Sequence, residues 1–99
     1  MGVRSRSSAG GAQRGLSIAG TVVTLTVPAT AMCAEIYVRT ADVAFARDGT
    51  DPSSTGGFVA HPDDLIILNS REELETFEAI RATGVSATVD VEYFTDLSG

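Results

Sequence analysis

The stretch from Val43 to Gly57, VAFARDGTDPSSTGG, restricts the fold more than any other part of this sequence. Its first part alternates with a period of two, which is the pattern of a half-buried β-strand. Asp48-Gly49 is a strong turn dipeptide, because glycine adopts a positive φ freely and aspartate tolerates it. Pro52 cannot donate to a sheet, so the chain must leave the sheet there. The stretch predicts an antiparallel β-domain that presents a loop over residues 48–57.

Other segments repeat this alternation, and turn residues separate them. Strands are predicted over residues 21–27, 34–40, 43–47, 57–60, 64–68, 77–82 and 87–94. This pattern predicts one all-β domain over residues 20–99, a small antiparallel β-sandwich or jelly-roll-like module. Its predicted core comprises Val23, Leu25, Ile36, Val38, Phe45, Ile66, Leu68, Ile80, Val89 and Val91.

One segment leaves helix and strand both open. Ser70 followed by Glu73 forms a capping box and predicts a helical turn over residues 71–74. Residues 72–82 also carry Leu74, Phe77 and Ile80 at helical spacing. The strand over 77–82 is favoured because Thr-Gly follows it at 83–84, before a strongly alternating strand.

The N-terminal segment, residues 1–19, is rich in Gly, Ser, Ala and Arg and is predicted to be a flexible basic arm. An alternative is a signal peptide that continues through the apolar residues before Met32. The alternation of Val23, Leu25 and Val27 with threonines favours a strand instead. The apolar run is too short for a membrane span, so no membrane partner is expected.

Charge is distributed unevenly over the 99 residues, whose net charge is −6. The first nineteen residues carry three arginines and no acid, and the rest carries four arginines and thirteen acids. An acidic body repels phosphate, so nucleic acid is not an expected partner of the domain. Cys33 is the only cysteine and is expected to be a small buried apolar residue.

No catalytic or cofactor site is predicted. Ser53, His61 and Asp63 are formally a hydrolase triad, but no nucleophile-elbow or oxyanion motif accompanies them. His61 and Pro62 are therefore interpreted as turn or interface residues. His61 is the only histidine, which excludes a two-histidine metal site.

The loop after Arg47 offers oxygen ligands. Asp48, Thr50 and Asp51 can donate oxygens to Ca²⁺, with Asp63 or Asp64 near, but the EF-hand spacing is absent. An Asx turn at Asp48 is the favoured interpretation. No metal or other cofactor is predicted.

An acidic cluster lies farther along the chain, at Glu72, Glu73, Glu75 and Glu78. Acids crowded on an exposed turn stay ionised, unlike a glycosidase pair held across a cleft. The cluster is interpreted as a solvated face or as a docking patch for basic residues of a neighbouring copy, namely Arg4, Arg6 and Arg14.

Residues 20–94 resemble a group of small virion proteins of tailed bacteriophages. The resemblance lies in an ordered series of motifs: LTVPA at 25–29, IYV at 36–38, RDGTDPS at 47–53, DLIILNSREELETFEAIRA at 64–82 and ATVDVEYF at 87–94. It implies a non-enzymatic β-domain of the particle, and in particular a capsid decoration (cement) protein. Such a protein is assembled in the host cytoplasm and binds the major capsid protein and copies of itself, as a homo-oligomer or in many copies.

The expected contact residues lie in the arm, in the long loop and near its end. They are Arg4, Arg6, Arg14, Asp48, Thr50, Asp51, Pro52, Phe58, His61 and Pro62. Two alternatives stay open: a neck or tail component, such as a connector or fibre-attachment protein, and a carbohydrate-binding module on the virion surface. The latter would use the few candidate aromatic platforms, Tyr37, Phe58, Tyr93 and Phe94.

Overall fold

The eight strands that the structure describes pair as the two halves of one long hairpin that is folded over. A computed structural model describes residues 8–53 and 58–95. In chain order the elements are β1 (Ser8–Ile18), β2 (Val23–Thr24), β3 (Cys33–Val38), β4 (Val43–Ala46), β5 (Phe58–Ala60), β6 (Leu65–Leu68), α1 (Arg71–Thr76), β7 (Glu78–Arg81) and β8 (Ala87–Phe94). Along the hairpin, β4 pairs with β5, β3 with β6, β2 with β7 and β1 with β8, always antiparallel.

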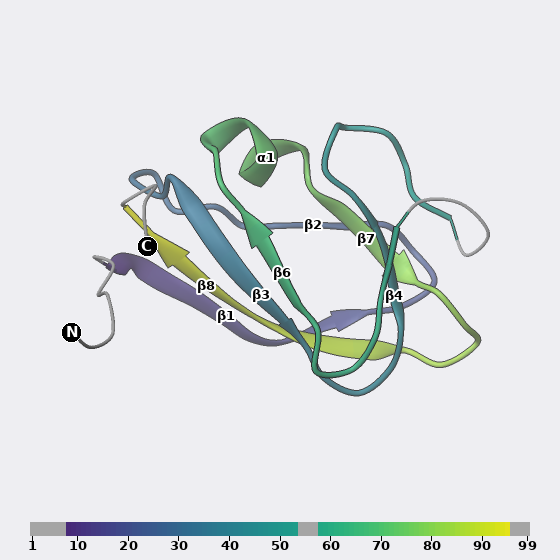
Figure 1. Ribbon diagram of the computed structural model, residues 1–99. Helices are drawn as coiled ribbons and strands as arrows, with labels where there is room; N and C mark the ends of the chain where they lie inside the picture. The colour runs from purple at the N-terminus through teal and green to yellow at the C-terminus, as the bar shows by residue number, and fades with distance from the viewer. Residues whose placement is uncertain (1–7, 54–57, 96–99) are drawn as a thin grey trace.

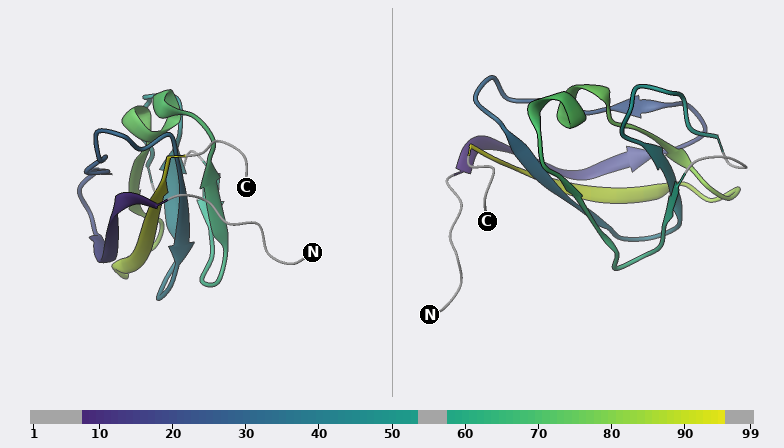
Figure 2. Two further views of the ribbon diagram at one scale, coloured as in Figure 1. Left: turned by 90° about the vertical axis from the view of Figure 1, so that its left-hand side faces the viewer. Right: turned by 45° about the horizontal axis from the view of Figure 1, so that its top comes forward.

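Two further pairings roll the hairpin into two sheets. β3 also pairs with β8, and β4 with β7, so that the sheet orders are β1-β8-β3-β6 and β2-β7-β4-β5. The sheets lie face to face, and α1 covers one end of the sandwich (Figure 1, Figure 2). The predicted all-β sandwich is confirmed. Its strand order is that of a jelly roll, an eight-stranded sandwich made of two Greek keys.

The core lies between the two sheets and follows the predicted alternation closely. Seven predicted core residues are buried: Ile36, Val38, Phe45, Ile66, Leu68, Val89 and Val91. Val23 and Leu25 are only half-buried against this core, and Ile80 is also half-buried, outside it. Buried residues that were not predicted include Ile18, Leu74, Phe77 and Tyr93. Cys33 is buried, as expected.

The prediction of a flexible arm over residues 1–19 is wrong for residues 8–18, which form β1 along β8. The register between β1 and β8 shifts twice, and the glycines of β1, whose composition suggested an arm, lie within these two irregular stretches. Gly15 has a φ of 67°, a left-handed conformation that glycine adopts without strain, and its N–H donates to Asp90 Oδ1 at 2.8 Å. Arg4 and Arg6 lie outside the described residues.

Side chains of β1 also explain why this segment is ordered. Ile18 is buried in the core, and Leu16 packs partly against it. Gln13 Oε1 accepts hydrogen bonds from the Tyr93 hydroxyl and from the Thr26 N–H. Burial raises the pKa of Tyr93 to about 12, so its hydroxyl remains a donor over the ordinary pH range.

The strand predicted over 21–27 is much shorter in the structure. Only Val23 and Thr24 pair with β7, because the Thr26 N–H bonds to Gln13 instead of to a neighbouring strand. The predicted alternation is nevertheless visible, since Leu25 and Val27 pack partly against the core.

The segment in which helix and strand competed contains both. Ser70 caps α1 by accepting the Glu73 N–H at 3.1 Å, as the capping box predicted. The Glu73 carboxylate accepts the N–H of Asn69, one residue earlier than a standard capping box. The favoured strand is confirmed as β7, in which Ala79 is buried and Glu78 and Ile80 are half-buried. No helix within residues 8–53 and 58–95 has the length and apolarity to cross a membrane.

Candidate interaction surface

Strands β5 and β6 follow each other in the chain, and each forms an edge of one of the two sheets. Both strands carry exposed apolar side chains. Phe58 and Val59 belong to β5, and Leu65 and Ile67 belong to β6; we call these four residues the apolar edge. Phe58 is 64% exposed and Leu65 is 50% exposed. Val59, Leu65 and Ile67 line one hollow and Phe58 lines another, and Arg47 lines both. Clustered exposed apolar side chains are typical of a contact with another molecule.

An aromatic row connects the apolar edge to the core. The ring centroids of Phe45 and Phe58 are 6.0 Å apart, and those of Phe45 and Phe77 are 5.9 Å apart. The Arg47 guanidinium lies 5.9 Å from the centroids of both Phe45 and Phe58. Favourable cation–π geometry therefore holds Arg47 over the row, at the mouth of the sandwich.

Beside this row lies a hollow of about 460 Å³ that brings together three of the predicted contact residues. Asp48, Thr50 and Phe58 line it together with Phe45, Arg47 and Glu73. Asp48 Oδ1 accepts the Thr50 N–H at 3.1 Å and its hydroxyl at 2.6 Å, which lowers the pKa of Asp48. The predicted Asx turn is confirmed, and Gly49 supplies its positive φ of 87°. Within the described parts of the chain, no three acidic, histidine or cysteine residues are grouped to hold a metal.

Two predicted contact residues point elsewhere. Pro52 is buried and lines a different hollow, beside Ile80 and Arg81 of β7. Asp51 lies beside the carboxyl group of Glu78, and their hydrogen bond, together with burial, raises the pKa of Glu78. The loop after Arg47 is thus partly an internal support and only partly a presented surface.

Replacing Glu78 with glutamine is expected to raise the melting temperature at pH 7. A carboxyl group whose pKa is raised by folding stabilises the folded state below its unfolded pKa, near 4.5, and this contribution is lost as the pH rises through the folded pKa. The amide removes the repulsion with Asp51 and should flatten the dependence of the melting temperature on pH above 4.5. Thermal unfolding between pH 4 and 8 tests this, and an unchanged pH profile would contradict it.

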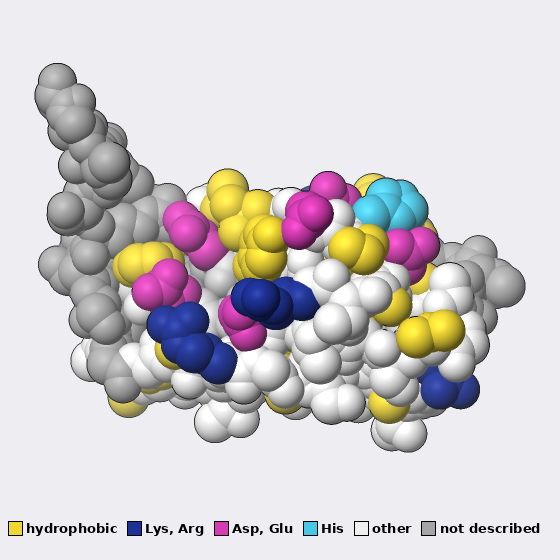
Figure 3. All heavy atoms as spheres, turned by 90° about the horizontal axis from the view of Figure 1, so that it is seen from below, with side chains coloured by type: hydrophobic (Ala, Val, Ile, Leu, Met, Phe, Trp, Pro, Cys, Tyr) yellow, Lys and Arg dark blue, Asp and Glu magenta, His cyan; other side chains and the backbone are white. Residues whose placement is uncertain are grey.

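His61 lies at the turn between β5 and β6, and the structure gives His61 and Asp63 of the formal Ser53-His61-Asp63 combination other partners. His61 Nδ1 lies 2.9 Å from Asp42 Oδ1, and the His61 N–H donates to Asp64 Oδ2. Asp63 accepts the Tyr37 hydroxyl at 2.6 Å instead. Figure 3 shows the histidine beside an acidic side chain, near one end of a face on which apolar and charged side chains alternate.

The hydrogen bond and charge of Asp42 raise the pKa of His61, so Asp42→Asn is expected to lower it toward 6.5. The stabilisation that this pair contributes is complete below pH 6.5 and is lost as the pH rises through the folded pKa. Because the chain has one histidine, NMR titration of its ring measures this pKa directly. Asp64→Asn removes a weaker charge interaction with the ring, and the carboxylate that accepts the backbone His61 N–H, so it should shift the ring pKa less. Equal shifts in the two variants would refute the assignment.

Arg14 lies on β1, away from the Asp48 turn. It lines a shallow hollow of about 160 Å³ on the outer face of the first sheet, with Tyr37, Leu65 and Asp90 among its neighbours. The pKa of Asp90 is lowered by the Gly15 N–H, and further by Arg39 and Arg14. Arg39 binds Asp90 at 2.7 Å.

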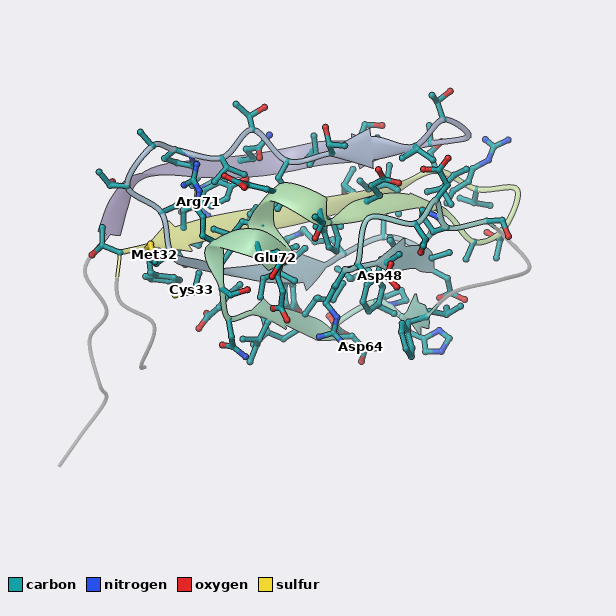
Figure 4. The ribbon with its side chains drawn as sticks, turned by 90° about the horizontal axis from the view of Figure 1, so that it is seen from above. Met32, Cys33, Asp48, Asp64, Arg71 and Glu72 are labelled. Carbon is teal, nitrogen blue, oxygen red and sulfur yellow. The ribbon has the colours of Figure 1, made fainter. Side chains whose placement is uncertain are left out.

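Three glutamates of the acidic cluster each interact with a different residue of the same domain. Glu73 accepts the Asn69 N–H, Glu75 pairs with Arg71 at 2.9 Å, and Glu78 faces Asp51. Figure 4 shows Glu72 and Arg71 at the start of α1. The proposed pairing of this cluster with Arg4 and Arg6 of a neighbouring copy stays a prediction, since both arginines lie outside the described residues.

Sequence reasoning missed Val59, Leu65 and Ile67. The run DLIIL was interpreted as a nearly continuous apolar strand, which does not say which side chains face solvent. The alternation of the opposite strand contains that information, because Glu35 pairs with Ile67 and Tyr37 with Leu65. Polar or amphipathic outward residues on β3 therefore indicate that their β6 partners also point outward.

Fold and surface together define a small jelly-roll domain in which four exposed apolar side chains lie along one pair of strands, β5 and β6. Comparison with known proteins returns no matching family model, no matching curated protein and no matching solved structure.

Proposed function

We propose that this chain is a structural protein of a tailed-phage particle that binds the outer surface of the major capsid shell in many copies. The observation that carries the proposal is the apolar edge, which adjoins the aromatic row and the Asp48 turn on one side of the domain. The ordered motifs over residues 20–94 support the virion assignment. The jelly roll is also a fold of viral capsid domains, although a fold alone does not define a function.

The mechanism is burial of apolar surface, repeated over many copies. Phe58 supplies a large exposed ring that is backed by Phe45 and flanked by Arg47, and such an aromatic anchor beside arginine is typical of interaction hot spots. One such contact is small, but a lattice of subunits that each bind weakly gains strength through avidity.

The copy number of this chain in purified particles tests the proposal. Quantitative mass spectrometry against the major capsid protein should find a near-stoichiometric or threefold-related ratio. A dozen copies or fewer would instead support a neck or tail component, and absence from particles would overturn the virion assignment. Glycan-array binding that is abolished by Tyr37→Ala would favour the carbohydrate-binding alternative.

Phe58→Ser is expected to weaken binding to capsids at least about tenfold, because it removes the anchor from the apolar edge. Val85→Ser is the matched control, since Val85 is 62% exposed but lies in the turn before β8. Co-sedimentation of each variant with shells that lack this chain measures the effect. Equal binding by both variants would show that the apolar edge is not the contact.

A further inference from the structure

Strand β6 has one side without a partner strand in the described structure. Along its other side it pairs with β3, and the Val38 N–H donates to Asp64 O at 3.0 Å. Because successive residues of an antiparallel strand direct their backbone groups to opposite sides, Ile66 and Leu68 also face β3. The N–H and C=O groups of Leu65 and Ile67 therefore point to the open side.

Both ends of this open stretch are closed by bonds within the domain. The Asp63 N–H donates to Val38 O at 2.8 Å, and the Asn69 N–H donates to the Glu73 carboxylate at 2.8 Å. Leu65 and Ile67 thus offer a short ladder of two donors and two acceptors. A hollow of about 260 Å³, lined by Arg47, Val59, Leu65 and Ile67 among others, lies alongside.

The other three edges of the described sheets are poor templates for pairing. β1 has two register shifts, β2 has two residues and β5 has three. Bulges and short strands are common protections of sheet edges, whereas an apolar strand with regular pairing leaves its edge open. The side chains of Leu65 and Ile67 add apolar surface to that edge.

We propose that β6 pairs with β6 of a second copy of this chain, antiparallel about a twofold axis at Ile66. Leu65 of each copy then lies opposite Ile67 of the other. This register matches both donors and both acceptors of one copy with those of its partner, and it keeps buried and exposed side chains on the same faces. The β1-β8-β3-β6 sheet of one copy and the same sheet of the second copy then form one continuous eight-stranded sheet.

The edge itself favours a second copy as the occupant. An antiparallel twofold pairing is self-complementary, because the two open residues are equivalent by symmetry. It also places Asp63 and Asp64 of the two copies at opposite ends of the ladder, whereas a parallel pairing would bring these acids together. A register centred on Ile67 would need the Asn69 N–H, which Glu73 already occupies.

The pairing is a property of the isolated chain and does not depend on the proposed function. Sedimentation of the purified protein should show a mass that rises from 10.3 kDa toward twice that value with concentration, up to about 1 mM. Ile67→Lys should weaken self-association at least about tenfold, because a charge on the edge opposes pairing. Val85→Lys is the matched control and should leave it unchanged. A monomer at every concentration, or equal effects of both variants, would overturn the proposal.

Cross-linking tests the register and does not depend on how strongly the lysine acts. Leu65→Cys and Ile67→Cys are made as separate variants, with folding verified by circular dichroism. In the proposed register their Cα atoms lie about 5.5 Å apart across the dimer, within the span of a disulfide. Oxidation of an equal mixture should give more cross-linked dimer than either variant alone, while buried Cys33 stays unreactive. Equal yields in all three samples would refute this register.

Discussion

Replacing Leu68 with alanine is expected to lower the free energy of unfolding by about 2–5 kcal/mol, the range for a buried leucine that leaves a cavity. Leu68 is fully buried in the core and lies opposite Ala34 of β3. A domain of this size has only about 5–15 kcal/mol of stability, so the loss is a large part of the total. Urea unfolding followed by circular dichroism measures it through the midpoint.

Leu65→Ala is the control on the same strand. Leu65 is 50% exposed, so its truncation should change the free energy of unfolding by no more than about 0.5–1 kcal/mol. Both measurements are made at high dilution, where self-association does not contribute. If the two variants were destabilised equally, the inward and outward faces of β6 would be wrongly assigned.

Arg71→Met is expected to cost at least about 2 kcal/mol and to loosen the loop before β3. The Arg71 Nη1 donates to Pro28 O at 2.7 Å and to Ala31 O at 2.9 Å, and both hydrogen bonds are partly buried. Figure 4 shows Arg71 extending from α1 toward this loop. Methionine keeps the aliphatic volume but leaves two carbonyl groups without their charged donor, and each such loss costs about 1–3 kcal/mol.

Glu75→Gln separates this anchoring from the surface ion pair. Glu75 binds the same guanidinium at 2.9 Å, but it is exposed, so its replacement should cost less than about 0.5 kcal/mol. Hydrogen exchange provides a local readout: the Ala31 N–H, which donates to Pro28 O, should exchange faster only in Arg71→Met. Faster exchange in both variants, or in neither, would contradict the anchoring role of Arg71.

The candidate surface was only partly predictable. Asp48, Thr50 and Phe58 were expected as contacts, and they line one hollow. They follow from a turn motif and an exposed aromatic residue, which are local features. Pro52 was expected beside them but is buried, because its burial depends on how the loop folds back near β7.

Strand β1 likewise depends on contacts with distant residues and not on a local sequence feature. Its glycines, serines and arginines have the composition of a mobile segment, and no local pattern predicts a strand. The strand is held by residues far along the chain: Gly15 donates to Asp90, and Gln13 binds Tyr93. These hydrogen bonds join residues that are seventy-five or more positions apart, so the sequence around residues 8–18 does not predict them.

Sequence alone determined the all-β class, most strand positions, the capped helical turn and the Asx turn at Asp48. These features depend on backbone preferences and side-chain alternation within a few residues, which any chain with this sequence carries into folding. Only the tertiary structure decided the jelly-roll order, the inclusion of β1 and the exposure of Leu65 and Ile67. Burial is decided by which strand lies on each side, and the partners of β6 and β8 come from distant parts of the chain.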